Sequence, residues 1–524
     1  MTLLAERYGQ HSAVKAWQID NEFGCHDTVR CYCDSCRRTF QRWLQERYDD
    51  IDTLNEAWFN VFWSMEYPGF EEIELPNLTV TEANPSHSLD FCRFASDSVI
   101  GYHRLQTGIL RKLSPGRLLL HNSMGYFGDY DHYQLAEDLD AIAWDNYPLG
   151  GLELSPYPDD VKARFLRSGH PDMIAFNHDL YRGVKGKPFW VMEQQPGQVN
   201  WAPSNPLPAP GVVRLWTHQA FAHGAEVVSY FRWRAAPGAQ ELMHAGLNLH
   251  DGRPDRASEE VRRVATELDP DGAVTGAPVA LLLDYQNLWA TALQPHAQGW
   301  SYWGILYAYY SVLRSLGIDV DIIPPSRNLD DYRLVLAPAL HLVDEKLAGH
   351  LGRYLEQGGR LVLGPRSGAK TPSNRVQAPA PGPLRRLAGV RIDHSDALRP
   401  GISGAVILGE KHHRYHTWAD LLSPEGAAVL AHYQVDAYAG SAAITRNPLG
   451  AGACFTVGPW GSDELHRALF RKLLAEVGLE THELPEGVRR SRLRGRGWLL
   501  NFGPETVVTA WGELPGYGVK RLDS

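Results

Sequence analysis

The sequence predicts an α/β fold, in which a (β/α)8 TIM barrel is followed by a second α/β unit and a small C-terminal β domain. Three observations predict it: apolar strands alternate with helical patterns over the first ~265 residues, polar side chains follow each strand, and the alternation resumes after a polar stretch. Apolar strands separated by helices are typical of a parallel sheet covered on both faces. Barrel enzymes carry their catalytic groups at the C-terminal ends of such strands.

Five strand patterns support the barrel prediction. They are "VKAWQIDNEF" (14–23), "RLLLHNS" (117–123), "AIAWDNYP" (141–148), "PFWVMEQQ" (188–195) and "VVSYFRW" (227–233). Helices are expected between them, for example at 36–48 and 89–113, where apolar residues recur with helical spacing. A closed barrel has eight strands, so residues 1–268 are expected to form a catalytic barrel domain that is incomplete at its N-terminal side.

A second α/β unit is expected over residues 276–475. Its signals are the strands "VALLLD", "IDVDIIP", "YRLVLAPAL" and "RLVLGP", with helices near 301–316 and 343–357. This order resembles a doubly wound or amidotransferase-like fold. The elbow after its fourth strand contains Ser367, which has no evident base partner, so a scaffold is favoured over a second active site. Residues 371–383 are expected to form a loop, and 480–524 a small β domain.

Composition excludes several classes of protein. The 524 residues are 44% hydrophobic and 21% charged, as in globular proteins. A net charge of −10 argues against nucleic acid and anionic membranes as partners. No apolar run approaches the ~18 residues of a membrane span, and the N-terminus shows no signal-peptide pattern. We therefore expect a cytoplasmic protein.

Two carboxylates stand at the ends of two predicted strands, Glu22 and Glu193. Glycoside hydrolysis needs such a pair, one to protonate the leaving oxygen and one to attack or to activate water. Asn21 is placed to hydrogen-bond a sugar hydroxyl, and Trp201 offers a flat platform at the same rim. Tyr147 can donate a hydrogen bond to a carboxylate and keep it ionised.

Five motifs occur together in order: "QIDNEFG", "CYCDSC", "AWDNYP", "FWVMEQQPGQVNW" and "YFRWRAAPGAQELMHAGL". With them the chain resembles glycoside hydrolase family 42, the β-galactosidases, from residue 14 to about 470. The resemblance implies a TIM barrel (here strands 4–8), an amidotransferase-like trimerisation domain and a C-terminal β domain. It implies a homotrimeric hydrolase of O-glycosyl bonds that removes terminal β-D-galactose with retention and without a cofactor.

The resemblance also assigns roles to individual residues. Glu22 corresponds to the general acid/base and Glu193 to the nucleophile. The residues that correspond to the lining of a galactose subsite are Asn21, Trp63, Tyr147, Trp201, Phe231, Glu241 and His244.

Cys31, Cys33 and Cys36 place three thiols on one short segment, which suits a structural zinc ion but falls short of the usual four ligands. In the family a fourth cysteine precedes the acid/base residue. Cys25 is a candidate substitute for it. Free thiols remain the alternative interpretation.

In the family, the strand at 14–23 is the fourth of the barrel, and three βα units precede it. We therefore expect Met1 to be a misassigned start or a truncation, and this chain alone to be poorly soluble and weakly active or inactive. Two alternative functions stay open. One is an inactive or sugar-binding barrel remnant, and the other is an α-L-arabinopyranosidase, whose substrate shares the galacto-configured hydroxyls.

Overall fold

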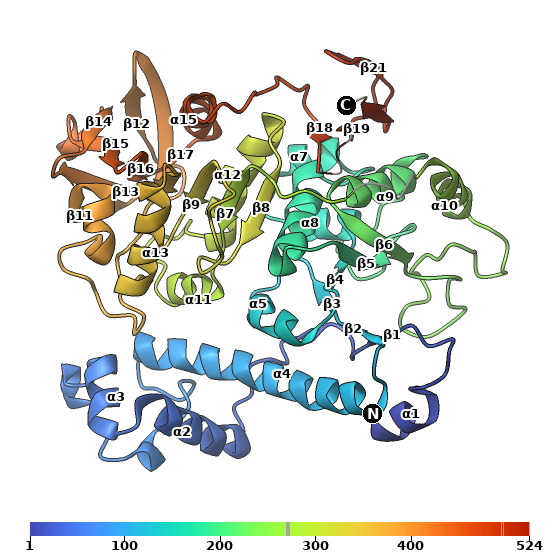
Figure 1. Ribbon diagram of the computed structural model, residues 1–524, viewed down its shortest axis with the longest axis horizontal. Coiled ribbons are helices and arrows are strands. Elements are labelled where there is room, and N and C mark those ends of the chain that lie inside the picture. Colours follow the sequence, from blue (N-terminus) through green and yellow to red (C-terminus); the bar gives the residue numbers. More distant parts are fainter. Residues whose placement is uncertain (269–272, 494, 496, 523–524) are drawn as a thin grey trace.

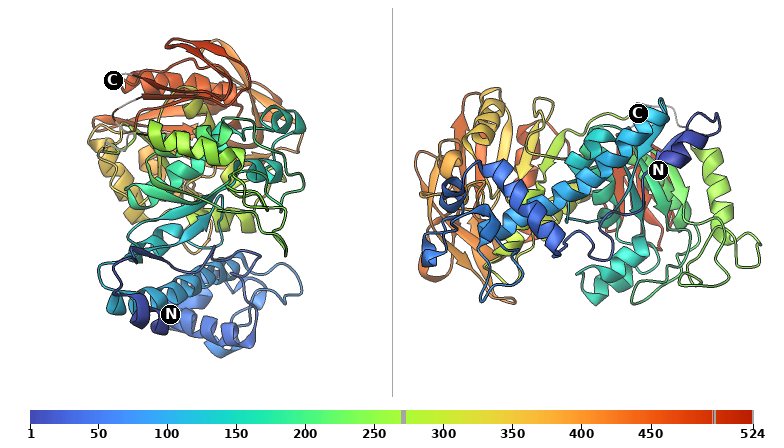
Figure 2. Two further views of the ribbon diagram at one scale, coloured as in Figure 1. Left: turned by 90° about the vertical axis from the view of Figure 1, so that its right-hand side faces the viewer. Right: turned by 90° about the horizontal axis from the view of Figure 1, so that it is seen from below.

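The computed structural model describes residues 1–268, 273–493, 495 and 497–522. Figure 1 shows the N-terminal helices at the bottom, the first group of parallel strands on the right and the second α/β unit on the left. Turned by 90°, the N-terminal helices form a layer of their own against the rest of the molecule (Figure 2).

The first group of strands follows the chain order. The strands are β1 (Ala16–Gln18), β2 (Leu118–Leu120), β3 (Asn122–Met124), β4 (Ala143–Asn146), β5 (Phe189–Gln194) and β6 (Ala225–Tyr230). β1 pairs with β2, and β3 to β6 pair in succession, with every pairing parallel. Only His121 separates β2 from β3, so these two short strands together correspond to the one strand pattern predicted at 117–123. The six labelled strands therefore match the five strand patterns that the sequence predicted.

Helices precede, separate and follow these strands. They are α1 (Thr2–Tyr8), α2 (Asp34–Tyr48), α3 (Ile51–Trp58), η1 (Phe62–Ser64), η2 (Phe70–Glu72), α4 (Pro85–Leu113), α5 (His132–Leu135), η3 (Ala136–Asp138), α6 (Pro148–Leu154), α7 (Asp159–Arg164), α8 (Pro171–Lys185), α9 (Val212–Ala222) and α10 (Arg256–Glu267). The helical patterns expected at 36–48 and 89–113 are confirmed as α2 and α4. Asn84 caps α4 by accepting from the Ser86 N–H, and Pro85 occupies its first turn, where a missing N–H costs nothing.

The second unit contains one large mixed sheet. Its parallel strands are β7 (Val279–Leu282), β8 (Val320–Ile323), β9 (Leu334–Ala337), β10 (Arg360–Leu363) and β16 (Gly452–Val457), in the order β8-β7-β9-β10-β16. The main helices are α11 (Tyr285–Leu293), α12 (Tyr302–Ser315), α13 (Glu345–Glu356) and α15 (Asp463–Glu476), with the short η4 (Gly382–Leu384), α14 (Arg385–Ala388) and η5 (Asp436–Tyr438). The expected helices near 301–316 and 343–357 are therefore present.

An antiparallel extension of this sheet was not predicted. It comprises β11 (Val390–Ala397), β12 (Ser403–Leu408), β13 (Lys411–Pro424), β14 (Ala428–Tyr433), β15 (Ala442–Leu449) and β17 (Pro459–Gly461). Exposed and buried residues mix along β11 and β13, so their sequences lack the continuous apolar runs of the parallel strands.

The C-terminal strands pack against the first group of elements. They are β18 (Val488–Ser491), β19 (Gly497–Asn501), β20 (Val507–Thr509), β21 (Gly512–Leu514) and β22 (Val519–Leu522). Both Asp172 carboxylate oxygens accept from the Arg489 guanidinium at 2.6 Å, and Leu500 and Phe502 join an apolar core that contains Trp216.

Helix α8 belongs to the first unit and packs against both α/β units, and 13 of its 15 residues are buried. It packs against β4, β5 and β8. A Cβ atom on Gly183 would lie 1.8 Å from the Ile322 carbonyl oxygen, so only glycine permits this approach to β8. Next to it, Arg182 donates to the Asp321 carboxylate at 2.7 Å and to the carbonyls of Val320 and His223.

In the part of the chain that the structure describes, we find no helix whose length and apolarity would allow it to cross a membrane. The expected cytoplasmic location stays a prediction.

Replacing Arg182 by methionine should lower the free energy of unfolding by roughly 3–5 kcal/mol, because two buried carboxylates, Asp179 and Asp321, would lose their cation. Urea denaturation followed by tryptophan fluorescence measures this. The matched control is Arg104→Met, which breaks the exposed ion pairs of Arg104 with Glu137 and Asp138 and should cost less than about 1 kcal/mol. Equal losses in the two variants would contradict the argument.

Candidate active site

Three carboxylates meet where neighbouring parallel strands end. Glu22 lies in the turn after β1, Asp145 in β4 and Glu193 in β5, and one carboxylate oxygen from each lies within 4.8 Å of the others. Asp145 and Glu193 are direct partners in the register of β4 and β5. The structure therefore brings together the two acids that the sequence singled out and adds a third.

Asn122 at the start of β3 holds the turn with Glu22 in place. Its Nδ2 donates to Asn21 Oδ1 at 2.8 Å and to Asp145 Oδ2 at 2.7 Å. Its Oδ1 accepts from Gln18 Nε2 at 2.9 Å and from the Glu22 N–H at 3.4 Å. Glu22 has a φ of 39°, in the left-handed region, and such strain persists only where surrounding contacts impose the conformation. The side chain of Asn122 supplies those contacts.

Glu193 is held by Tyr147. The Tyr147 hydroxyl donates to Glu193 Oε2 at 2.5 Å. Burial raises the pKa of Glu193, the Tyr147 hydrogen bond lowers it, and the Glu22 charge raises it again, which leaves the pKa above its ordinary value. Tyr147 therefore acts against the other two effects and favours the ionised carboxylate.

Asp145 is the most buried of the three acids, with 5% of its surface exposed. Burial, followed by the charges of Glu193 and Glu22, raises the pKa of Asp145 well above its usual range. Its Oδ1 has no hydrogen-bond partner among the described residues. Carboxylates at this spacing disfavour one another's ionisation, and the burial of Asp145 favours its protonated form.

Sequence reasoning missed Asp145. A signal for it exists, because Asp145 and Tyr147 are two residues apart at the end of one strand, and side chains with this spacing face the same side.

Rings form one wall beside Tyr147. Its ring centroid lies 5.6 Å from that of Trp201 and 5.7 Å from that of His244, and Phe231 lies 5.2 Å from His244. Trp201 can lie against α6 because Gly150 has no side chain; a Cβ there would be 2.4 Å from the indole. Four residues of the predicted galactose subsite are thus neighbours.

Glu241 is near the same wall. Its carboxylate accepts from Arg232 at 2.9 Å, its backbone carbonyl accepts from the His244 N–H at 2.9 Å, and its charge contributes to the raised pKa of Glu193. The Asn21 side chain donates to Glu22 Oε2 at 3.5 Å. Both residues therefore lie beside the carboxylates.

Trp63 is placed elsewhere. It lies in η1, 68% exposed, with its ring 4.9 Å from that of Phe62. Figure 1 shows α3, which leads into η1, at the end of α4 that is remote from β1. Within one chain, no described hydrogen bond or ring contact joins Trp63 to the carboxylates.

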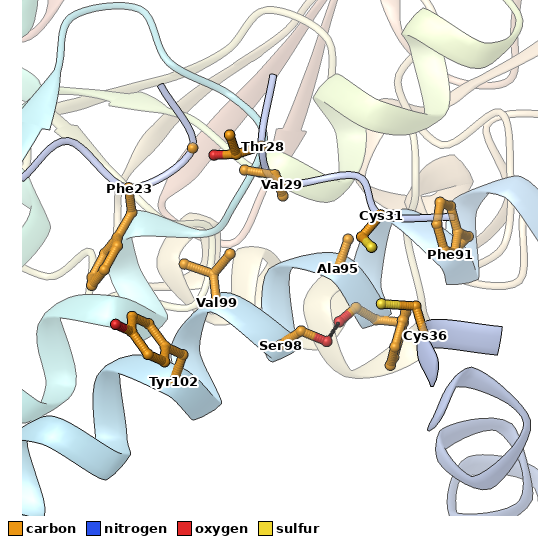
Figure 3. A pocket seen from close by; sticks show the side chains of 12 residues that line it. Phe23, Thr28, Val29, Cys31, Cys36, Phe91, Ala95, Ser98, Val99 and Tyr102 are labelled. Carbon is orange, nitrogen blue, oxygen red and sulfur yellow. Dashed lines mark hydrogen bonds between the residues drawn. The ribbon is translucent and has the colours of Figure 1, made fainter. Parts of the chain in front are cut away.

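The three predicted thiol ligands do lie together. The sulfur atoms of Cys31, Cys33 and Cys36 are within 4.8 Å of one another. Figure 3 shows Cys31 and Cys36 at one end of a pocket beside α4, with Phe23 and Tyr102 at the other. The backbone N–H of Cys36, followed by the thiols of Cys31 and Cys36, lowers the pKa of Cys33 to about 7, which favours the thiolate that zinc binds.

Cys25 is not part of this cluster. The backbone N–H of Cys25 donates to the Glu22 carbonyl at 3.0 Å, so Cys25 lies in the turn that carries Glu22, and burial, followed by the charge of Glu22, raises the pKa of its thiol. Among the described residues, the group of possible metal ligands around Cys31, Cys33 and Cys36 contains no fourth member.

Comparison with known protein families gives two matches. Residues 1–270 match the glycoside hydrolase 42 model described as "Beta-galactosidase", and residues 277–480 match the model described as "Beta-galactosidase trimerisation domain".

Individual proteins agree with these matches. A β-galactosidase of Thermus thermophilus is 48% identical over 513 residues, which cover 97% of this chain and 77% of that protein. The β-galactosidase BgaH of Haloferax lucentense is 43% identical over 99% of this chain and 78% of its own length. The crystal structure of a β-galactosidase from the psychrophilic Marinomonas ef1 superimposes with a TM-score of 0.94 at 42% identity, covering 99% of this chain and 81% of that one.

Replacing Tyr147 by phenylalanine should move the acidic limb of the pH–activity profile to higher pH. The variant removes a donor that favours ionised Glu193, so the pKa of Glu193 rises further. A hydrogen bond to a charged group contributes about 1.5–3 kcal/mol, which corresponds to about one to two pH units. The pH dependence of kcat/KM measures it. Tyr157→Phe is the control, because its hydroxyl donates to Tyr307 and not to a carboxylate. An unshifted acidic limb in Tyr147→Phe would contradict the assigned role.

Proposed function

Because the chain belongs to the glycoside hydrolase family 42 β-galactosidases, we propose that it hydrolyses terminal, non-reducing β-D-galactose residues from β-galactosides. The observation that carries this proposal is the distance of at most 4.8 Å between carboxylate oxygens of Glu22 and Glu193. Retaining glycosidases hold their two carboxyl groups ~5–5.5 Å apart, whereas inverting enzymes need ~6.5–9.5 Å to admit a water molecule. The spacing therefore favours retention.

In the proposed mechanism, the Glu193 carboxylate attacks the anomeric carbon while the Glu22 carboxyl group protonates the departing glycosidic oxygen. This step forms a covalent galactosyl-enzyme and leaves Glu22 as a carboxylate. Glu22 then takes a proton from water as the water oxygen attacks the anomeric carbon. The bond between that carbon and Glu193 breaks, which regenerates the Glu193 carboxylate and releases galactose with its original configuration. Tyr147 stabilises the ionised Glu193 before attack, and a protonated Asp145 adds no further negative charge beside it.

Recognition of the sugar is assigned to the residues around this pair. Asn21 and Glu241 offer polar groups to hydroxyls, and Trp201 and Phe231 offer flat apolar surfaces. His244 is neutral, since burial lowers its pKa, and its Nδ1 lies 3.1 Å from the Ala245 carbonyl. The Nε2 of the same ring is then an acceptor for a sugar hydroxyl.

Removing each carboxylate separately should produce two different defects. Glu193→Gly should lower kcat by about a thousandfold or more, and azide should restore turnover as the α-galactosyl azide. For Glu22→Ala, the rate of hydrolysis should fall about 10²–10⁴-fold on substrates with poor leaving groups. The fall should be much smaller on a dinitrophenyl galactoside, because a good leaving group needs little protonation. Product analysis by NMR distinguishes the anomers.

The control for both is Glu226→Gln, which changes a glutamate at the opposite, N-terminal end of strand β6. Near-normal turnover by Glu193→Gly would refute its role as nucleophile. The same assays with nitrophenyl α-L-arabinopyranoside test the alternative substrate. Absence of turnover on both substrates in the unmodified chain would support the inactive-remnant alternative.

We further propose that the protein is a homotrimer. The second unit matches a family of trimerisation domains, and an apolar patch is exposed on the segment after α3. The patch comprises Phe59, Val61, Phe62, Trp63 and Met65, each 45–68% exposed. Contiguous exposed apolar groups mark interaction surfaces. In a closed ring the contacts are heterologous, so Trp63 of one subunit can line the galactose subsite of its neighbour while remaining remote from its own.

Mixed trimers should reveal this sharing of sites. Trp63→Ala and Glu193→Ala should each be weakly active or inactive alone. When the two are co-expressed at equal levels, about a quarter of sites should combine an intact Glu193 with a neighbour's intact Trp63, if one neighbour completes each site. Activity relative to wild type measures the recovery. Co-expression without recovery, or an active monomer in sedimentation, would contradict the proposal.

The cluster of Cys31, Cys33 and Cys36 is proposed to bind a structural zinc ion that takes no part in catalysis. The grouping of the three sulfur atoms supports it. Free thiols are the alternative.

A further inference from the structure

A second polar cavity lies in the second α/β unit, away from the three carboxylates. It has a volume of about 710 Å³ and opens where β9 and β10 end, between the loop that follows β10 and the strands β11 and β13. The carboxyl ends of parallel strands are the usual ligand-binding edge of an open α/β sheet. Its position alone does not make this cavity a binding site, because the side chains that line the cavity determine what it can bind.

Arg366 occupies the elbow after β10. Its φ is 64°, in the left-handed region that non-glycine residues rarely adopt, and its N–H donates to Asp420 Oδ2 at 2.8 Å. The neighbouring Ser367 is committed to the backbone, because its hydroxyl donates to the Gly364 carbonyl at 2.8 Å and accepts from the Leu340 N–H at 3.2 Å. The elbow therefore presents a cation in place of a nucleophile.

Two buried cations line this cavity. The Arg366 guanidinium lies between the rings of Trp300 and Trp418, at 4.5 and 4.8 Å, and donates to backbone carbonyls at 2.8 and 3.0 Å. Lys370, 7% exposed, donates to the side-chain oxygen of Gln294. Neither cation forms a side-chain ion pair with a described carboxylate.

The negative groups in the lining do not balance them. Asp420 is buried and already accepts from Arg366 N, Ser395 Oγ and Trp418 Nε1. Asp393 is exposed and pairs with Arg391. Burial is the larger cause, and the charge of Arg366 the smaller, of a lowering of the Lys370 pKa to about 8. With Asp393 paired to Arg391, Asp420 is the one remaining carboxylate among the described residues of the lining, beside two cations. A bound anion would relieve this excess of positive charge.

His341 adds an unused acceptor. It is 2% exposed, and its Nδ1 lies 3.2 Å from the Arg366 carbonyl oxygen, so this nitrogen carries the proton and donates. Its Nε2 is buried and has no partner among the described residues. Burial, with the charges of Arg366 and Lys370, lowers the pKa of His341 well below its usual range and keeps the ring neutral. The Nε2 atom is therefore an unpaired acceptor on a residue that lines the cavity.

We propose that this cavity binds a small polyhydroxylated anion, such as a sugar phosphate or a sugar acid. Its anionic group would lie against Lys370 and Arg366, and a hydroxyl would donate to His341 Nε2. The volume accommodates a molecule of this size. This binding site is independent of the hydrolytic site, which lies on the first group of strands.

The experiment uses the full chain and four probes: glucose 6-phosphate, gluconate, orthophosphate and neutral glucose. Calorimetric titration should detect binding of at least one of the first two, weaker binding of orthophosphate and none of glucose. Hydrogen exchange should show protection over residues 366–380 when the organic anion is present. If only glucose 6-phosphate binds, the site recognises a phosphate group, and if only gluconate binds, it recognises a carboxylate. Either result supports the proposal.

Variants locate the site. Lys370→Met and His341→Phe should each weaken binding at least tenfold, whereas the surface variant Lys346→Met should bind as the wild type does. Glu193→Gly should also bind unchanged, which separates this site from the hydrolytic one. The proposal is overturned if neither organic anion binds, if orthophosphate binds as tightly as they do, or if Lys370→Met binds normally while circular dichroism shows it folded.

Discussion

The buried guanidinium of Arg182 joins the two α/β units of this chain through ionic contacts. It binds Asp179 on its own helix and Asp321 on strand β8, while the His223 imidazole and the Tyr310 hydroxyl complete the partners of Asp179. Every charged group in the cluster is buried, so each depends on the others to offset the loss of water. The cluster holds α8 against β8 on one side and beneath β4 and β5 on the other.

The catalytic geometry depends on this support, because β4 and β5 carry Asp145 and Glu193. Their register makes these two residues direct partners, and the Asn122 side chain attaches the turn that holds Glu22. Three acids at this spacing repel one another when ionised. The site resolves the repulsion by unequal environments: burial keeps the proton on Asp145, while Tyr147 donates to Glu193. Differences of this kind allow neighbouring carboxyl groups to take different roles.

Both α/β units gather polar side chains at the carboxyl ends of parallel strands, but these side chains are acidic in the first unit and basic in the second. In each, parallel strands end at a common edge and deliver polar side chains to one place. The first unit gathers Glu22, Asp145 and Glu193, and the second gathers Arg366 and Lys370 around a cavity. In the second unit Ser367 is bonded to the backbone, which agrees with the sequence-based preference for a scaffold without a second nucleophile.

The sequence by itself determined the parallel strands, the long helices and the two acids at the strand ends, because strand and helix patterns and the residues that follow them are local properties. It also determined the family, since five motifs in order carry the resemblance. Only the tertiary structure decided that Asp145 joins the two acids and that Cys25 stands apart from the other three thiols. It also decided that the helical segment leading to Trp63 lies at the end of α4 remote from β1. Strand register, burial and the path of an inserted helical segment arise from contacts between residues far apart in the sequence, and no local pattern encodes them.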